Sequence, residues 1–280
     1  MAQAIQSVNI PRLEKIAREL RVDVIRMLEA AGSGHPGGSF SEMEILVALY
    51  FHRLRHDPKN PAWEGRDRLI LSKGHGCPGL YACLARAGYF PHEELASLRK
   101  IGSRLQGHPD RLRLPGIEVS TGSLGQGLSM AIGMALAAKL DGASWRTYCI
   151  LGDGEIQEGQ IWEAAMAAPK FNLDNLTVIL DHNNGQIDGP VEEIMPLAPL
   201  PEKWKAFNWH VQCIDGHDFK EIFAALETAD AVQGKPHAIL AKTVKGKGVS
   251  FMEHQIEWHG KAPNREQAEK AVAELAGKPD

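Results

Sequence analysis

Short apolar runs alternate with helical patterns along most of this chain, and that alternation limits its fold more than any other feature. Five apolar runs predict buried strands, at 68–71, 147–151, 176–180, 210–214 and 237–242. Helical patterns precede or separate these runs, at 11–31, 41–55, 76–88, 127–140, 160–168 and 218–233. Alternation of this kind favours an α/β fold, in which a parallel sheet carries helices on both faces.

Local signals set the expected limits of the first helices. Pro11 is placed to open the first helix and Gly32 to close it. Ser41 and Glu44 have the spacing of a capping box, which predicts that the second helix begins at Ser41. Much later, the stretch 185–208 is rich in proline and lacks periodicity, and we expect it to be a long surface excursion.

Composition indicates an ordinary globular protein. With 44% hydrophobic and 24% charged residues, the chain can bury a sizeable core, and disorder is excluded. We expect residues 1–280 to form a single domain with a core over about 10–265. A charged helix is expected in the tail from Lys261, including 266–280.

Charge and targeting signals narrow the class of protein. The 31 basic and 35 acidic residues leave a net charge of −4, which argues against nucleic acid or an anionic membrane as a partner. The N-terminus lacks the apolar core of a signal peptide, and no apolar stretch is long enough to span a bilayer. The four cysteines lack CxxC pairing and zinc-ligand spacing, so we expect reduced core residues. These features predict a cytoplasmic enzyme or enzyme subunit.

Glycine-rich polar segments are where functional residues are expected. The segment from Gly32 to Gly37 matches the GxGxxG fingerprint of dinucleotide-binding folds, but it follows a long helix instead of a strand and contains Pro36. Its context therefore argues against a nicotinamide site. The segment 121–127, TGSLGQG, precedes an almost wholly apolar helix, so its amides are candidates for holding a ligand at a helix N-terminus.

Two polar motifs, each at the end of a predicted strand, form the sharpest candidate site. One contains Asp153 and Gly154 in LGDGE, and the other contains Asn183 in LDHNNG. Neighbouring parallel strands would place the carboxylate, the carboxamide and loop carbonyls on one rim of the sheet. These hard oxygen ligands suit Mg²⁺ or Ca²⁺ held jointly with the phosphates of a ligand, which the Gly154 amide could also approach. Either motif alone would more simply be a turn.

Four histidines share glycine neighbours: His35, His75, His108 and His259. Glycine leaves an imidazole accessible, so together they predict a histidine-lined pocket suited to hydrogen bonding with phosphates or an oxyanion and to proton transfer near neutral pH. The segment AKTVKGKG could contact a phosphate from this side or form a solvated basic loop. Its lysines are Lys242, Lys245 and Lys247.

Taken in order, GSGHPGG, LSKGHG, GHPD, TGSLGQG, LGDGEIQEG, LDHNNGQIDG and WHGK resemble the N-terminal, diphosphate-binding domain of transketolases. These thiamine diphosphate enzymes transfer two-carbon ketol units. The resemblance spans about residues 10–265 and implies thiamine diphosphate and Mg²⁺ or Ca²⁺ as cofactors. It also implies sugar phosphate substrates and a place in the pentose phosphate pathway.

The resemblance implies roles for individual residues. The expected metal ligands are Asp153, Asn183 and the Gly185 carbonyl. Gly154 would donate its amide to the diphosphate. Two catalytic histidines would contact the diphosphate and the reacting region, His75 and His259, and two would face the sugar hydroxyls, His35 and His108. Leu124 and Gly125 would pack against the cofactor rings. The other cofactor-binding positions are Ser123, Gly152 and Glu155.

The same resemblance implies a partner. Glu158 and Glu163 correspond to acidic residues near the subunit interface, where Glu158 would interact with the partner's catalytic glutamate. Many members have proline in place of Ser123 and a bulkier residue in place of Gly185, and both changes are compatible with these roles. Full transketolases continue into pyrimidine-binding and C-terminal domains. We therefore expect the N-terminal subunit of a split transketolase, active with a separately encoded pyrimidine-domain subunit in an α2β2 heterotetramer.

Two alternatives stay open. A subunit of a 2-oxo acid dehydrogenase or decarboxylase would share the GDG motif and the downstream asparagine, but it would not need four histidines to hold sugar hydroxyls. A non-catalytic module of the same fold is the second alternative, and the intact Asp153, Asn183 and histidines disfavour it.

Overall fold

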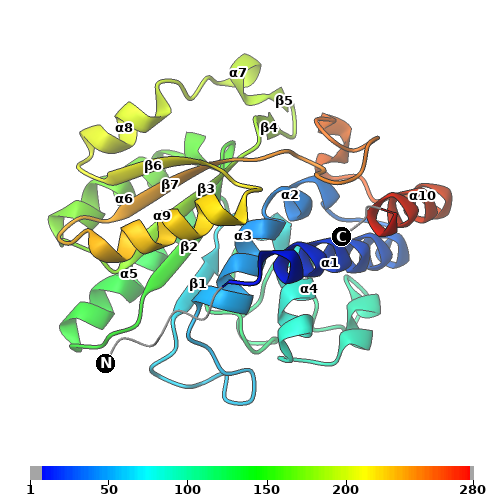
Figure 1. Ribbon diagram of the computed structural model, residues 1–280, viewed down its shortest axis with the longest axis horizontal. Helices are drawn as coiled ribbons and strands as arrows, with labels where there is room; N and C mark the ends of the chain where they lie inside the picture. The colour runs from blue at the N-terminus through cyan, green and yellow to red at the C-terminus, as the bar shows by residue number, and fades with distance from the viewer. Residues whose placement is uncertain (1–7, 278–280) are drawn as a thin grey trace.

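The computed structural model describes residues 8–277 and contains a five-stranded parallel sheet between two layers of helices (Figure 1). Its strands are β1 (Arg68–Leu71), β2 (Thr147–Gly152), β3 (Leu176–His182), β6 (His210–Asp215) and β7 (His237–Lys242). They lie in the order β1-β2-β3-β7-β6, and every neighbouring pair is parallel. All five predicted strands are present, with ends within two residues of those expected, but β6 is a half-exposed edge strand and not the buried strand that was predicted.

Alternating side chains of the strands build a core on each face of the sheet. Tyr148 and Ile150 point into one buried cluster, and Cys149 and Leu151 point into the other. The first cluster is covered by α1 (Ile10–Ala31), α3 (Met43–Ala48), α4 (Cys77–Ala87), α9 (Phe219–Ala231) and α10 (Arg265–Ala276). The second is covered by α5 (Gln126–Leu140), α6 (Gly159–Lys170) and α8 (Leu200–Ala206). The expected helices on both faces are therefore confirmed.

The first helix has the two predicted residues at its ends, Pro11 in its first turn and Gly32 at its C-cap, and a further cap that was not predicted. Asn9 caps its N-terminus by accepting from the Arg12 amide at 3.0 Å, and Gly32 ends it in a left-handed conformation with φ +64°. Short 3₁₀ turns elsewhere cover Gly74–Gly76, His92–Ser97, Glu155–Gln157 and Ile256–His259.

The prediction of one second helix that begins at Ser41 is wrong, because the helical region begins earlier and is divided into shorter pieces. The chain forms α2 (Pro36–Ser41), α3 and then a π-helical turn, Leu49–Arg53. Ser41 donates its hydroxyl to Asp181 at 2.6 Å, and the Glu44 carboxylate pairs with Arg21, also at 2.6 Å. These buried tertiary partners take the two side chains that the capping box would have used.

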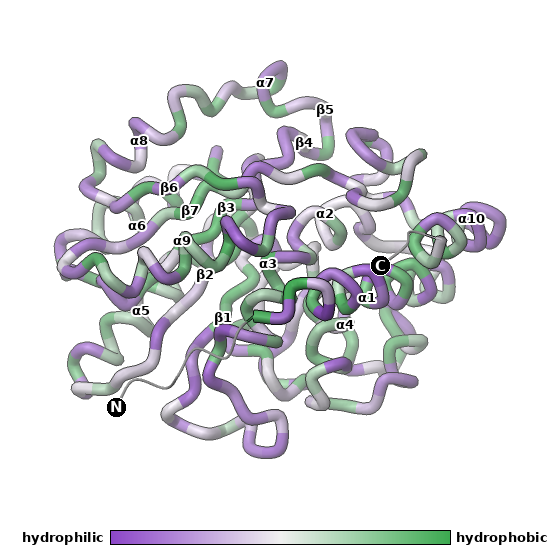
Figure 2. Tube along the Cα trace, in the orientation of Figure 1, coloured by the Kyte–Doolittle hydropathy of each residue, from purple (hydrophilic) through white to green (hydrophobic). Residues whose placement is uncertain are grey.

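The excursion over 185–208 is more ordered than expected. It contains the hairpin β4 (Gly185–Gln186) and β5 (Gly189–Pro190), then α7 (Val191–Ile194) and α8. Trp204 of α8 is fully buried, so the segment is anchored to the core. Its outer part mixes hydrophilic and hydrophobic residues and exposes Ile187, Ile194 and Met195 (Figure 2).

The C-terminal helix begins at Arg265 and not near Lys261, because Asn264 and Gln267 form a capping box there. It packs on α1, and residues 278–280 of the predicted tail lie outside the described residues.

Of the four free cysteines, Cys213 is exposed, so it is not the core residue that was expected. Over residues 8–277, no helix is both long and apolar enough to cross a membrane.

Candidate active site

The two strand-end motifs meet at the carboxyl edge of the sheet. Gly152 is the register partner of Asp181, so Asp153 and Asn183 leave adjacent strands on the same rim. The buried Asp153 carboxylate accepts hydrogen bonds from the Gly154 amide, at 2.9 Å, and from the Asn184 amide. The sequence-based expectation that these motifs converge is therefore confirmed in the geometry.

The oxygen atoms on this rim suit a hard cation such as Mg²⁺, but they are too few to fill its coordination shell without a bound ligand. The Asn183 Oδ1 accepts from the Gly185 amide at 3.1 Å, while its Nδ2 donates to Asp181 at 3.2 Å, which fixes the orientation of the carboxamide. Within residues 8–277, no three His, Cys, Asp or Glu side chains cluster as a metal site. A divalent cation held by Asp153 and Asn183 would thus need further oxygens, and phosphate oxygens suit it.

Three of the four predicted histidines form a cluster beside this rim. The ring centroids of His35, His75 and His259 lie 5.2 to 5.6 Å from one another. Burial lowers the pKa of His35 to about 4 and that of His259 to about 3, and it lowers the pKa of His75 as well. All three imidazoles are therefore neutral at pH 7, each able to donate one hydrogen bond and accept one.

His108 stands at the exposed side of this cluster. Its ring packs against Gly122, where a Cβ would come within 2.9 Å of it. Burial and then the nearby Arg99 lower the pKa of His108, and both Arg99 and His108 in turn lower that of His35. The structure thus brings all four predicted histidines into one region.

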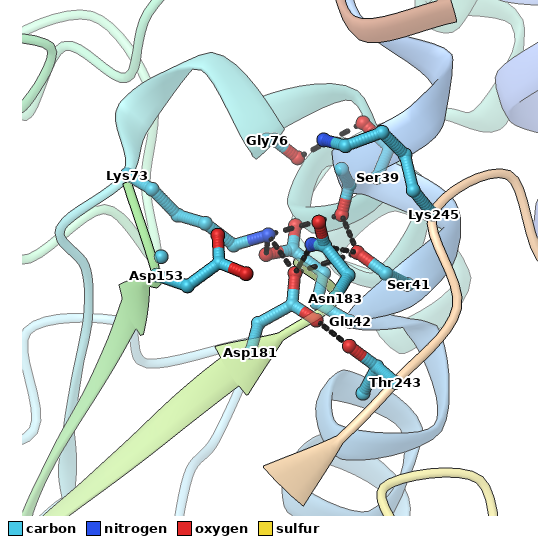
Figure 3. Close-up of polar contacts among 12 residues, drawn as sticks. Ser39, Ser41, Glu42, Lys73, Gly76, Asp153, Asp181, Asn183, Thr243 and Lys245 are labelled. Atoms are coloured by element: carbon cyan, nitrogen blue, oxygen red, sulfur yellow. Dashed lines mark hydrogen bonds and ion pairs between the residues drawn. The ribbon is translucent and has the colours of Figure 1, made fainter. Parts of the chain in front are cut away.

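A buried charge network that the sequence analysis missed lies beneath the rim (Figure 3). The Lys73 ammonium contacts Asp181 at 2.5 Å, Glu42 at 2.8 Å and the Gly38 carbonyl at 3.0 Å. Ser41 and Thr243 donate their hydroxyls to Asp181. The only sequence signal was a lysine in LSKGHG immediately after an apolar strand, where a charge must find buried partners.

The two carboxylates of this network are held differently. Burial would raise the pKa of Asp181, but Lys73 and the hydroxyl donors bring it below its ordinary value. Burial raises the pKa of Glu42 to about 8, with Lys73 opposing the shift and Asp181 adding to it. One ammonium therefore compensates one of the two carboxylates, and Glu42 is the one that favours its proton.

Lys245 is a second buried cation. It differs in this respect from Lys242 in the same lysine-rich segment, which is exposed. Its side chain is 3% exposed, and its ammonium lies 3.3 Å from His259 Nδ1 with no carboxylate partner within ion-pair distance among the described residues. Burial lowers its pKa to about 8. Lys242 is exposed at the end of β7, whereas Lys245 is a buried group facing the histidine cluster. A buried ammonium in this position suits an anionic ligand.

The TGSLGQG loop reaches the same edge, but not all its amides are free. Gly125, at φ +85°, donates its amide to the buried Glu155 carboxylate at 3.0 Å. Leu124 is half-buried and Ser123 is exposed, so both remain accessible to a ligand. Glu155 itself is 2% exposed and faces the loops instead of the open rim. Two further acidic residues, Glu158 and Glu163, are exposed.

Comparison with known proteins assigns this arrangement to a family. Residues 12–280 match the family model described as "Transketolase, thiamine diphosphate binding domain". The chain is 51% identical to the 6-deoxy-6-sulfo-D-fructose transketolase subunit SqwG of a Clostridium species, over 96% of this chain and 97% of that protein. It is 42% identical to one of the subunits of the apulose-4-phosphate transketolase of Actinobacillus succinogenes, over 96% of this chain and 98% of that protein.

The fold agrees with the sequence comparisons. A crystal structure of the transketolase of Campylobacter jejuni superimposes with a TM-score of 0.91 and 37% identity, and the match covers 96% of this chain. It covers 43% of that longer chain, so the present chain corresponds to less than half of it.

Proposed function

The chain belongs to the transketolase family, as an N-terminal subunit with the thiamine diphosphate-binding domain, and we propose that its site holds that cofactor for two-carbon ketol transfer between sugar phosphates. The observation that carries this proposal is the meeting of Asp153 and Asn183 with a neutral histidine cluster and the buried Lys245. The comparisons favour this over the dehydrogenase, decarboxylase and non-catalytic alternatives.

Oxygen atoms would hold the metal, and an ammonium with neighbouring imidazoles would hold the diphosphate. Asp153, the Asn183 carboxamide and the Gly185 carbonyl would hold Mg²⁺ or Ca²⁺, and the cation would offset the charge of a diphosphate. Lys245, with His75 and His259 beside it, would face the diphosphate and balance its charge. Bound thiamine diphosphate supplies the nucleophilic carbon that carries the ketol unit.

The histidines would act on the substrate. Because burial keeps His35 neutral at pH 7, it can accept a proton from one hydroxyl or donate to a carbonyl oxygen. His108, at the exposed side of the cluster, would hold a sugar hydroxyl at the mouth of the site. Leu124 and Gly125 would contact the cofactor rings, and Gly154 the diphosphate.

A separate pyrimidine-domain subunit would complete the enzyme. The two relatives named as subunits are matched over nearly their whole length, whereas the Campylobacter transketolase is matched over 43% of its chain. Exposed apolar side chains on α5 and α6, Leu140 and Met166, lie on the same pair of helices as the exposed Glu163. We expect this surface to be covered in a heterotetramer with two copies of each chain, and Glu158 to meet the partner's glutamate.

The substrates we propose are sugar phosphates of the pentose phosphate pathway, in the cytoplasm. The 51% identity to a subunit named for 6-deoxy-6-sulfo-D-fructose favours a sulfonated ketose as a second candidate. Both carry an anionic end, and a comparison of the two as donors distinguishes them.

Calorimetric titration of thiamine diphosphate with Mg²⁺ into the assembled enzyme tests the site. Asp153→Ala removes a charged ligand and should abolish binding, while Asn183→Ala should weaken it. Asp188→Ala, at an exposed carboxylate of the β4–β5 hairpin, is the matched control and should bind as the wild type does. Unchanged affinity in Asp153→Ala would eliminate the assigned metal site.

A further inference from the structure

The carboxylate of Glu155 accepts hydrogen bonds from three sites: the end of the preceding strand β2, the residue after β1 and the N-cap of α5. Its Oε1 accepts from the Ser72 hydroxyl at 2.5 Å and from the Gly125 amide at 3.0 Å. Its Oε2 accepts from the Gly152 amide, also at 3.0 Å. The residue is 2% exposed, so these donors and not water satisfy it.

Each of these donors lies within three residues of a residue of the proposed site along the chain. Ser72 precedes Lys73 and His75, Gly152 precedes Asp153, and Gly125 follows Leu124. We propose that Glu155 is a positioning residue that fixes the ring-contacting 122–125 loop relative to the metal- and diphosphate-binding loops. This inference rests on the proposed cofactor site.

The three donor sites depend on the carboxylate to different degrees. The Ser72 amide donates to the Ile150 carbonyl at 2.9 Å, and Gly152 is held in register with Asp181, so the sheet fixes both. Gly125 lies outside the sheet: it is the N-cap of α5 in a left-handed conformation, φ +85°, and its amide is bonded to Glu155. Loss of the carboxylate should therefore release the 122–125 loop first.

Close packing shows why this connection has little tolerance. A Cβ at Gly127 would lie 2.3 Å from the Ser72 hydroxyl oxygen, so the first turn of α5 is pressed against the loop that leads to His75. The Glu155 carboxylate lies between these segments and accepts from both. A glutamine at 155 has the same size, but its amide group would face at least one of the two backbone N–H groups, which is a donor facing a donor. Because the sheet holds Gly152 in place, we expect the glutamine oxygen to face Gly152 and the Gly125 amide to lose its acceptor.

The test compares two probes on the assembled enzyme: thiamine diphosphate and inorganic pyrophosphate, each with Mg²⁺. Glu155→Gln should weaken thiamine diphosphate about tenfold or more, since a hydrogen bond to a charged group is lost next to the ring site. It should weaken pyrophosphate by less than about threefold, because Asp153 and Asn183 remain held by the sheet. Glu118→Gln, which removes a carboxylate paired with Arg66 away from this rim, should leave both affinities unchanged.

Three results would overturn the positioning role: wild-type affinity for thiamine diphosphate in Glu155→Gln, equal weakening of both probes, or an effect matched by Glu118→Gln. Should Glu155→Gln fail to fold, hydrogen exchange in the wild-type assembly decides instead. The Gly125 amide should then exchange slowly, and fast exchange would contradict its bond to Glu155. A wild-type enzyme that binds neither probe would refute the proposed function itself.

Discussion

Glu42 is one of two buried carboxylates that share a single ammonium, so the folded protein favours its protonated form. Replacing Glu42 by glutamine should therefore change the stability of the protein by an amount that depends on pH. The Glu42 side chain is fully buried, and Lys73 is its ion-pair partner at 2.8 Å, shared with Asp181 at 2.5 Å. Burial raises the pKa of Glu42 to about 8, with Lys73 opposing the shift. Glu42→Gln keeps the shape and removes the ability to ionise.

The size of the effect follows from linkage. A carboxyl whose pKa is raised on folding stabilises the folded state fully below its ordinary pKa, and this contribution is lost as the pH rises through the folded value. With an ordinary pKa of 4.5 and a folded value of about 8, the loss falls mainly between those limits. Between pH 5.5 and 7.5 it amounts to roughly 2–3 kcal/mol, since one pKa unit corresponds to about 1.4 kcal/mol.

Urea denaturation of the wild type and Glu42→Gln at these two pH values measures the difference directly. Relative to the wild type, the variant should gain about 2–3 kcal/mol of unfolding free energy as the pH rises from 5.5 to 7.5. Asp174→Asn is the matched control: burial alone would raise the pKa of Asp174, but its hydrogen bond with Lys139 brings it below its ordinary value. That carboxylate stays ionised at both pH values, so its mutational cost should not change. A constant difference for Glu42→Gln would refute the reasoning.

Two further predictions concern the ligand groups. His35→Ala and His108→Ala should leave thiamine diphosphate affinity nearly intact and change steady-state kinetics, whereas His75→Ala should also weaken the cofactor; wild-type behaviour of all three would contradict the histidine pocket. Because burial lowers the pKa of Lys245 to about 8, cofactor binding at pH 8.5 should take up protons as the diphosphate stabilises the ammonium. Calorimetry in buffers of different ionisation enthalpy measures this uptake, and its persistence in Lys245→Met would assign it to another group.

The pattern of apolar residues was sufficient to predict the strands of the sheet, but not the partners of the buried polar side chains. Strands β1, β2, β3 and β7 were predictable because nearly all their residues are buried on both faces, whereas β6 is a half-exposed edge strand that only its apolar run marked. The convergence of Asp153 with Asn183 followed from parallel pairing alone. The capping box at Ser41 failed because Asp181, 140 residues away, takes its hydroxyl. Local spacing carries no information on such a distant partner.

The same limit applies to the candidate site. Four histidines could be chosen because glycine neighbours are a local signal, whereas the burial of Lys245 and its closeness to His259 depend on how the 243–259 segment folds over the rim. The resemblance implied that Glu155 is a cofactor-binding position. Its three hydrogen bonds involve segments that only the tertiary fold brings together, so no local pattern could predict them.

The central claim, that this chain is one subunit of a heteromeric transketolase, is tested most directly by a coupled ketol-transfer assay. The purified chain is measured alone and in mixtures with increasing amounts of the pyrimidine-domain subunit. The account predicts no turnover by either chain alone and activity that saturates at one partner per chain, because the carboxylate that activates the cofactor's pyrimidine ring would come from the partner. Turnover by this chain alone, as fast as by the mixture, would contradict it.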